Sequence, residues 1–317
     1  MAKKKAWTVS QDPDLNVITV DFPDVRAGWE QWWMVSADRH WDNPHSNRRL
    51  QREHLELAKK RNAIITEIGD TYCCMEGRFD PRRTNVGVNV RAEHQRKDYL
   101  GALTRTGVNW FAPYAEQFAM FGYGNHETAC LKNNSYDLIS NLVEGLNNKA
   151  GTNIKVGGYN GYLRFKFRMQ KTRRHTINVF YTHGSGGGGP VTKGTIQTNR
   201  RAVWNPDASI VLSGHIHEQW IMPLSRYRLS QDGVPYHDYQ VHVQTPTYKE
   251  EYGDGKEGWH VERGAPPKPL GCQWFRFYYA SDAIWLDTAM SFPMTTGGHM
   301  RELLLADDEN PYARPDD

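Results

Sequence analysis

The sequence predicts an α/β protein in which several strands bring polar side chains to one edge of a sheet. Two observations support this: short apolar runs alternate with helix-like segments, and five of the runs stop at Asp, Asn or His. These runs are residues 31–37, 63–68, 118–123, 176–182 and 210–213. Ligands bind at the carboxyl ends of strands in open α/β sheets. We therefore expect the five polar ends to share one crevice.

The first three runs end in side chains that carry oxygen and nitrogen donors. Asp38-Arg39-His40 follows the first run, Gly69-Asp70 follows the second, and Gly124-Asn125-His126-Glu127 follows the third. The segment 47–61, with Leu50, His54, Leu57 and Ala58 at helical spacing, is expected to be the crossover helix between the first two. Residues 128–148 repeat leucine at helical spacing and predict one amphipathic helix.

The last two runs end in histidines. His183-Gly184 follows the fourth run, and Gly214-His215-Ile216-His217 follows the fifth. Two imidazoles separated by one residue after a tight turn can both point into one crevice and offer neutral nitrogens to a metal ion. A lone His-x-His pair is more often solvated, so this interpretation depends on the other strand ends. The glycine run 184–190, with Ser185, is expected to face the substrate because bare backbone permits close approach.

This ordered series of motifs resembles the calcineurin-like metallophosphoesterase family over about residues 30 to 220. The resemblance implies a four-layer αββα sandwich, in which two mixed β-sheets are flanked by helices and a two-metal centre lies at the strand ends. By similarity, the first metal would be held by Asp38, His40, Asp70 and His217. The second would be held by Asp70, Asn125, His183 and His215, with Asp70 bridging the two ions.

The expected chemistry explains these residue types. Two divalent ions about 3.5 to 4 Å apart can share a hydroxide and clamp a phosphoryl group for in-line displacement. Mixed nitrogen and oxygen ligands favour Mn, with Fe, Zn or Co as alternatives, over Mg or Ca. In the family, a histidine placed like His126 stabilises the transition state or protonates the leaving oxygen. The alternative is a histidine that only hydrogen-bonds to the ligands.

The chain departs from the family pattern at two positions. Cys73 stands where the family usually has Asp or Tyr three residues after the bridging aspartate, which argues against the purple acid phosphatase branch. Arg39 lies between two expected ligands, where it either contacts a substrate phosphate or pairs with Asp42.

Two basic segments bear on the substrate. The turn-rich loop 76–83 carries Arg78, Arg82 and Arg83, which either contact phosphate or are solvated. Residues 162–174 predict a hairpin with six basic side chains, either a solvated edge or a nucleic-acid surface. Trp41 and Trp220 flank expected ligands; stacking on a base is possible, although core packing is the commoner use of tryptophan.

Composition sets further bounds. The chain has 317 residues and a formal net charge of +3, too small to demand a polyanionic partner. The sequence shows no secretory signal, membrane span or disulfide framework, so we expect a cytoplasmic protein without a membrane partner. No protein partner can be inferred.

We expect one metallophosphoesterase domain over 1–305, followed by an acidic tail over 306–317. Its motif core is 30–220, and 221–305 supplies strands of the second sheet and a capping loop at 252–270. The two expected strands of that sheet are Gln240–Thr245 and Cys272–Tyr279.

These observations predict a two-metal phosphoesterase that cleaves phosphodiester bonds, in the first instance a DNA or RNA nuclease. The alternative is a phosphatase or cyclic-nucleotide phosphodiesterase with a small substrate. A closed pocket would favour the small substrate, and an open basic groove would favour nucleic acid. A scaffold that has lost the chemistry is a third hypothesis, but such a protein should lack ligands, and all of the expected ones are present.

Overall fold

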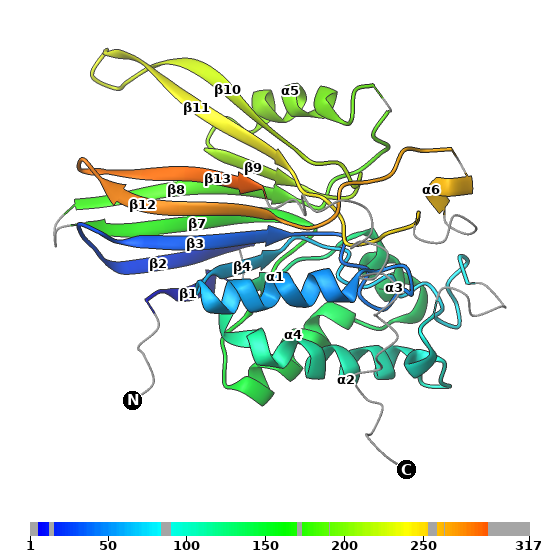
Figure 1. Cartoon of the computed structure of the whole chain (residues 1–317). Helices are drawn as coiled ribbons and strands as arrows, with labels where there is room; N and C mark the ends of the chain where they lie inside the picture. Colours follow the sequence, from blue (N-terminus) through cyan, green and yellow to red (C-terminus); the bar gives the residue numbers. More distant parts are fainter. Residues whose placement is uncertain are drawn as a thin grey trace, which may run out of the picture.

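The computed structural model describes residues 6–12, 16–83, 90–169, 173–189, 191–252, 259–262 and 264–290. Two mixed β-sheets pack face to face, and helices cover their outer faces (Figure 1). This four-layer α/β sandwich is the fold that the sequence predicts. No helix within the described ranges is long and apolar enough to cross a membrane.

The six-stranded sheet contains the first three motif strands side by side. β3 (Glu30–Ser36), β4 (Ile64–Glu67) and β5 (Phe118–Phe121) are parallel, so their carboxyl ends lie at the same edge. The sheet is completed by β6 (Lys155–Val156), beside β5, by β12 (Gln273–Ala280), beside β3, and by β13 (Ala283–Met290), beside β12 at the edge.

The seven-stranded sheet contains the last two motif strands. β8 (Arg173–Thr182) and β9 (Ile210–Ser213) are parallel neighbours, so His183 and the Gly-His-x-His motif also leave from one edge. In order, the sheet consists of β1 (Thr8–Asp12), β2 (Val17–Val25), β7 (Asn160–Met169), β8, β9, β11 (Pro235–Gln244) and β10 (Trp220–Leu229).

The main core lies between the sheets. Alternate residues of β7 are buried, including Leu163, Phe165 and Phe167, because strand side chains point to opposite faces with a period of two. Trp33 of the other sheet meets Phe165, with ring centroids 4.7 Å apart, and stacks on Phe275 at 4.8 Å. This aromatic layer holds the two sheets together and so fixes the relative positions of their carboxyl ends.

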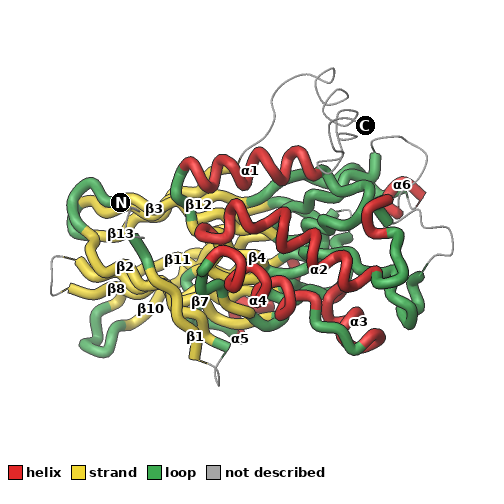
Figure 2. Tube along the Cα trace, turned by 90° about the horizontal axis from the view of Figure 1, so that it is seen from below, coloured by secondary structure: helices red, strands yellow, loops and turns green. Residues whose placement is uncertain are grey.

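The helices form the two outer layers. α1 (Arg48–Lys60), α2 (Tyr99–Phe111) and α4 (Leu138–Ala150) lie together over the six-stranded sheet (Figures 1 and 2). α5 (Thr195–Trp204) covers part of the seven-stranded sheet, where Trp204 contacts Phe180. The remaining helical segments are α3 (Asn125–Asn134), α6 (Trp259–Glu262) and two 3₁₀ turns, Ala92–His94 and Ala112–Gln117.

Two helix predictions need correction. The expected helix 128–148 is two helices, because Ser135 adopts a left-handed conformation with φ of 51° and the Asp137 carboxylate caps α4. The crossover helix is confirmed as α1, but its buried face carries Leu55 together with His54 and Ala58, whereas Leu50 and Leu57 are only half-buried.

The two strands assigned to a common second sheet lie in different sheets. β11 pairs with β9, whereas β12 pairs with β3. The sequence predicts no strand at β1, β2, β6, β10 or β13. Residues 253–258 and 263 of the expected capping loop, the hairpin turn 170–172 and the expected tail 306–317 lie outside the described residues.

Candidate metal centre

The two sheets bring all seven predicted metal ligands to one place. Asp38, His40, Asp70 and Asn125 leave the ends of β3, β4 and β5, and His183, His215 and His217 leave the ends of β8 and β9. Short backbone hydrogen bonds connect these loops: Asp38 N donates to Gly69 O at 3.0 Å, and Gly214 N donates to His183 O at 3.0 Å. The centre therefore lies between the two sheets.

Five of the seven predicted ligand residues have left-handed backbone conformations: Asp38, His40, Asp70, His215 and His217, with φ between 44° and 74°. Non-glycine residues rarely adopt this conformation, which costs about 1 to 3 kcal/mol each and is typical of functional sites. Gly69 has a φ of 112°, and a Cβ there would lie 2.7 Å from His183 Nδ1. Position 69, where the six-stranded and seven-stranded sheets meet, therefore requires glycine.

The first group of donors consists of Asp38, His40 and His217, whose ligand atoms lie within 4.8 Å of one another. His217 Nε2 is 3.3 Å from Asp38 Oδ1, and His40 Nε2 is 3.4 Å from His217 Nε2. Asp38 Oδ2 accepts a hydrogen bond from His215 N at 2.8 Å. Asp38 Oδ1 is buried and has no hydrogen-bond partner among the described residues.

The second group consists of Asp70, His183 and His215. His183 Nε2 lies 3.1 Å from Asp70 Oδ2, and Asn125 Oδ1 lies 2.8 Å from His215 Nδ1 and 3.2 Å from His183 Nε2. Asp38 Oδ1 is also 3.9 Å from His183 Nε2, so this carboxylate approaches both groups. Asp70 belongs to the second group here, and its bridging role stays a prediction.

The donor set fits two divalent cations. A buried carboxylate oxygen without a hydrogen bond lies 3.3 to 3.9 Å from three imidazole Nε2 atoms, and such an oxygen is costly unless a cation or proton compensates it. Two imidazole nitrogens that face each other at 3.4 Å likewise need a proton or a metal between them. Imidazole, carboxylate and amide donors suit Mn, Fe, Co or Zn.

Burial and neighbouring charges shift the pKa values of several of the predicted ligands. Burial opposes the charged form of His183, but Asp70, Asp38 and Glu127 outweigh burial and raise its pKa to about 10. Burial likewise opposes ionisation of Asp70, yet His183 and His126 hold the pKa of that carboxyl well below its usual range. Burial, with the neighbouring imidazoles, lowers the pKa of His40 and of His215. A metal that binds here must displace the proton of His183.

His126 is oriented toward the centre without belonging to either donor group. Its Nδ1 donates to Cys73 O at 2.7 Å, because a carbonyl can only accept, and this leaves Nε2 as the free lone pair. His126 Nε2 lies 3.8 Å from Asp70 Oδ2. Burial lowers the pKa of His126, and Arg82, whose Nη1 is 3.5 Å from His126 Nδ1, adds to this effect.

The predicted substrate contacts are placed unequally. Arg82 is fixed beside His126 by a two-pronged pair with Asp80, with Nε–Oδ1 at 2.9 Å and Nη2–Oδ2 at 2.7 Å. Arg78 and Arg83 are exposed on the same loop, and Ser185 is exposed two residues after His183. The loop 76–83 thus borders the centre, which supports its proposed role but leaves the contacts themselves as predictions.

The structure pairs Arg39 with Glu67 and not with Asp42. Its side chain is fully buried and turns away from the centre to pair with Glu67, while Nη2 donates to Ser36 Oγ at 2.7 Å. The guanidinium also lies over the Tyr248 ring, 5.0 Å from its centroid. Arg39 is therefore a structural cation between β4 and α1, and its full burial argues against a contact with substrate.

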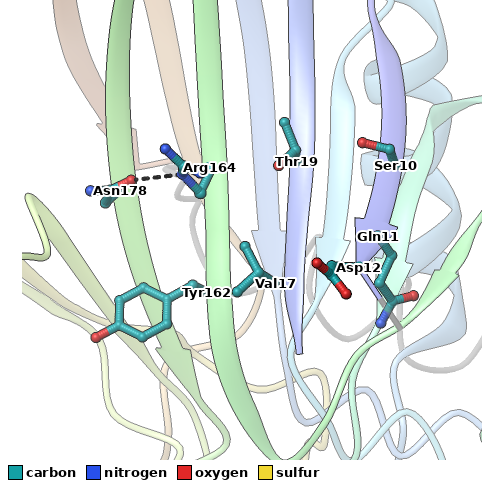
Figure 3. A pocket seen from close by; sticks show the side chains of 8 residues that line it. All are labelled: Ser10, Gln11, Asp12, Val17, Thr19, Tyr162, Arg164 and Asn178. Atoms are coloured by element: carbon teal, nitrogen blue, oxygen red, sulfur yellow. Dashed lines mark hydrogen bonds between the residues drawn. The ribbon is translucent and has the colours of Figure 1, made fainter. Parts of the chain in front are cut away.

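The basic hairpin is confirmed as β7 and β8, but most of its charge lies far from the centre. His183 follows the carboxyl end of β8, whereas Arg168 and Arg174 pair near its start, roughly 30 Å away at about 3.3 Å per residue. Arg164 lines a hollow of about 490 Å³ on the outer face of the sheet, where Nε donates to Asn178 Oδ1 at 3.4 Å (Figure 3). None of the eight residues that line this hollow is a predicted ligand.

The two tryptophans that flank predicted ligands, Trp41 and Trp220, lie in different surroundings. Trp41 is buried, and the Arg48 guanidinium covers it 4.2 Å from the ring centroid. Trp220 is partly buried and donates to Lys193 O at 2.9 Å. Core packing, the commoner use of tryptophan, therefore holds for Trp41.

Three residues that matter to the site were not singled out in the sequence. Glu127 accepts from Asp70 N at 3.1 Å, Tyr72 N at 2.8 Å and Gly124 N at 2.9 Å, and so joins two ligand loops. The Asp42 carboxylate accepts from Cys73 N and Cys74 N. The Lys249 side chain is 16% exposed and pairs with Glu251. Burial is the main cause of the lowered pKa values of His40 and His126, and the positive charge of Lys249 makes a smaller contribution in the same direction. Only Glu127 carried a signal, through its place in Gly-Asn-His-Glu.

Comparisons with known proteins concern the fold. No protein-family model and no curated protein matches the chain. Among solved structures, a predicted phosphoesterase from Streptococcus pneumoniae is similar at 11% identity and a TM-score of 0.30, over 83% of this chain and 90% of that one. The calcineurin-like phosphoesterase YfkN from Bacillus subtilis is similar at 10% identity and a TM-score of 0.30, over 82% and 88%. Vacuolar Protein Sorting 29 from Cryptosporidium parvum is similar at 10% identity and a TM-score of 0.34, over 82% and 97%. Calcineurin-like phosphoesterases, the family that the ordered motifs resemble, are therefore among the solved structures that this chain is similar to.

Proposed function

We propose that the protein is a metal-dependent phosphoesterase. One observation carries the proposal: seven side chains from five strand ends converge into two adjoining donor groups, joined by the unsatisfied Asp38 Oδ1. Asp38, His40 and His217 would hold one divalent ion, and Asp70, Asn125, His183 and His215 would hold the other. Bound there, such ions supply Lewis acidity to a phosphoryl group and lower the pKa of water.

The chain's own residues supply orientation and proton handling. The hydrogen bond from His126 Nδ1 to Cys73 O fixes the ring, so that Nε2 can exchange a proton with a reacting oxygen. Arg82, held rigidly by Asp80, provides positive charge beside that imidazole. Glu127 holds the backbone of Asp70 and of Gly124, which precedes Asn125.

For the substrate we propose a phosphodiester, in the first instance nucleic acid. The exposed Arg78 and Arg83 support this choice, because they add positive charge to the loop whose Arg82 lies beside His126. The hairpin arginines give little support, because they lie at the opposite end of the sheet. A phosphatase or cyclic-nucleotide phosphodiesterase acting on a small substrate stays the second candidate, since among the three arginines of loop 76–83 it is Arg82 that reaches His126, at 3.5 Å.

The test is hydrolysis in the presence of Mn²⁺, with bis-p-nitrophenyl phosphate, single-stranded DNA, duplex DNA and RNA as substrates. Asp70→Asn is the disabling variant, and Asp238→Asn, which loses a carboxylate that pairs with Arg226 on β10, is the matched control. Cleavage by wild type and control but not by Asp70→Asn is expected. Cleavage of the small diester alone would reject nucleic acid, and equal rates for all three proteins would reject the metal centre.

A further inference from the structure

A third group of donors lies beside the two already described. The Cys73 thiol, one nitrogen of His40 and one nitrogen of His126 lie within 4.8 Å of one another. Cys73 is 2% exposed, and the His40 and His126 ring centroids are 4.9 Å apart. The thiol is the only sulfur donor among the three metal-ligand groups found in the described residues.

The surroundings hold this group in place. The Asp42 carboxylate accepts from Cys73 N at 2.5 Å and from Cys74 N at 2.9 Å, so the cysteine loop is fixed at two successive peptides. Asn43 Nδ2 donates to Cys73 Sγ at 3.4 Å. His126 already gives its Nδ1 proton to Cys73 O, so its Nε2 lone pair is available to a cation.

The donor chemistry differs from that of the other two groups. One thiol and two imidazoles suit Zn²⁺, Co²⁺ or Cd²⁺, whereas the oxygen-rich groups also accept harder ions such as Mn²⁺. We propose that His40, Cys73 and His126 form a separate binding site for a thiophilic divalent cation. On binding, the S–H bond breaks, a sulfur–metal bond forms, and the proton passes to solvent.

A cation bound at this site would prevent His40 from serving the first donor group. A neutral imidazole has one lone pair, so His40 can serve either Asp38 and His217 or Cys73, but not both at once. A cation at Cys73 also occupies His126. Resting on the proposed function, the inference is that a thiophilic cation inhibits the enzyme by removing His40 from the first group and His126 from proton transfer.

The direct test is spectroscopic and needs no turnover. The chelated full-length protein is titrated with Co²⁺ while the near-ultraviolet thiolate-to-cobalt charge-transfer band and proton release are recorded. Wild type, Cys73→Ser and Cys272→Ser are compared. Cys272 is the matched control, because it is also a buried cysteine with a histidine beside it, Sγ to His54 Nδ1 at 3.4 Å, but it belongs to none of the groups of three donors found in the described part of the chain.

We expect the band in wild type and Cys272→Ser and its loss in Cys73→Ser, together with at least about a tenfold fall in Cd²⁺ affinity, since even outer contacts of metal ligands are worth 10- to 100-fold. A band that persists in Cys73→Ser, or none in cobalt-loaded wild type, would overturn the site. If Cys73→Ser does not fold, X-ray absorption of zinc-loaded wild type decides the matter: one sulfur neighbour supports the site, and none refutes it.

The inhibition is tested separately, in Mn²⁺-loaded protein with bis-p-nitrophenyl phosphate. One equivalent of Zn²⁺ is expected to lower the rate at least about tenfold in wild type and Cys272→Ser, if loss of His126 is worth what a general acid or base contributes. An unchanged rate despite the charge-transfer band would refute inhibition. A band without any Mn²⁺-supported hydrolysis would leave the thiol site standing and reject the phosphoesterase.

Discussion

The two sides of the metal centre are chemically unlike. The six-stranded sheet contributes Asp38, His40, Asp70 and Asn125, so three of its four donors are oxygens. The seven-stranded sheet contributes His183, His215 and His217, which are all imidazoles. Negative charge therefore comes from one sheet, and neutral or protonated nitrogen comes from the other.

This difference shows that neither sheet holds a complete site. Each of the two groups that contain a carboxylate combines that carboxylate, from the six-stranded sheet, with at least one imidazole from the seven-stranded sheet. Asp38 Oδ2 accepts from His215 N, and Thr247 Oγ1 and Tyr248 N donate to Asp38 O, so even the backbone of the first loop depends on segments that follow the second sheet. Metal binding at this centre therefore depends on the packing of the two sheets against each other.

The largest expected effect comes from removing the carboxylate side. Asp70→Asn should lower Mn²⁺-supported hydrolysis by about 1000-fold or more, because Lewis acidity is worth several kcal/mol in the transition state. Metal content after dialysis should fall with activity. A variant that kept its metal but lost activity would show that Asp70 acts on the reaction and not as a ligand.

The second prediction concerns the buried cation on the carboxylate side. Arg39→Ala should lower the free energy of unfolding by about 3 to 5 kcal/mol, because the buried Glu67 loses its ion-pair partner. Denaturant unfolding measures this loss. The double variant Arg39→Met with Glu67→Leu should recover much of it. An increased KM with unchanged stability would instead return Arg39 to the substrate.

The third prediction separates chemistry from coordination. His126→Ala should lower kcat by about 100-fold, as expected for loss of a general acid or base. Bound Mn²⁺ should not change, since within the described ranges His126 shares a donor group only with His40 and Cys73. Steady-state kinetics and metal analysis on the same preparation test both statements, and loss of manganese would make His126 a ligand.

The smallest effect concerns the imidazole side and depends on pH. His183 has a pKa raised to about 10, so in metal-free protein its charge stabilises the fold fully below about pH 6.5, and this stability is lost as pH rises to about 10. Mn²⁺ affinity should rise about tenfold per pH unit in this window, because binding releases one proton. Chelated thermal unfolding and Mn²⁺ titration at several pH values test it.

A matched variant makes this pH prediction specific. His183→Gln should flatten both profiles between pH 6.5 and 10, whereas the lowered pKa values of His40 and His215 place their titration below this window. Unchanged pH dependence in His183→Gln would assign the proton to another group.

Local sequence was enough to predict the five motif strands and the residues that follow them. The runs before Asp38, Asp70, Asn125, His183 and His215 are short, apolar and followed by turns, so their structure depends on nearby residues. Because parallel strands end at a common edge, the convergence followed as well. The layers came from the resemblance, and the structure confirms them.

What failed depends on contacts distant in sequence. Arg39 pairs with Glu67, 28 residues away, and nothing beside Arg39 announces that partner. β11 and β12 carry similar apolar patterns but pair with different sheets, because pairing is set by neighbours and not by the strand itself. The distance of Arg168 and Arg174 from the centre follows from strand direction, which composition does not reveal.

The left-handed backbone at five of the predicted ligands also limits which sequences can evolve here. A β-branched replacement at Asp38, His40 or Asp70 would lose a donor and clash with its own peptide, whereas Gly, Asn and Asp tolerate the geometry. Glycine at such a position would relax the chain and abolish coordination together. Selection for stability of the metal-free protein should therefore replace these residues first. Homologues that no longer need the metal centre would then have glycine or asparagine at these positions.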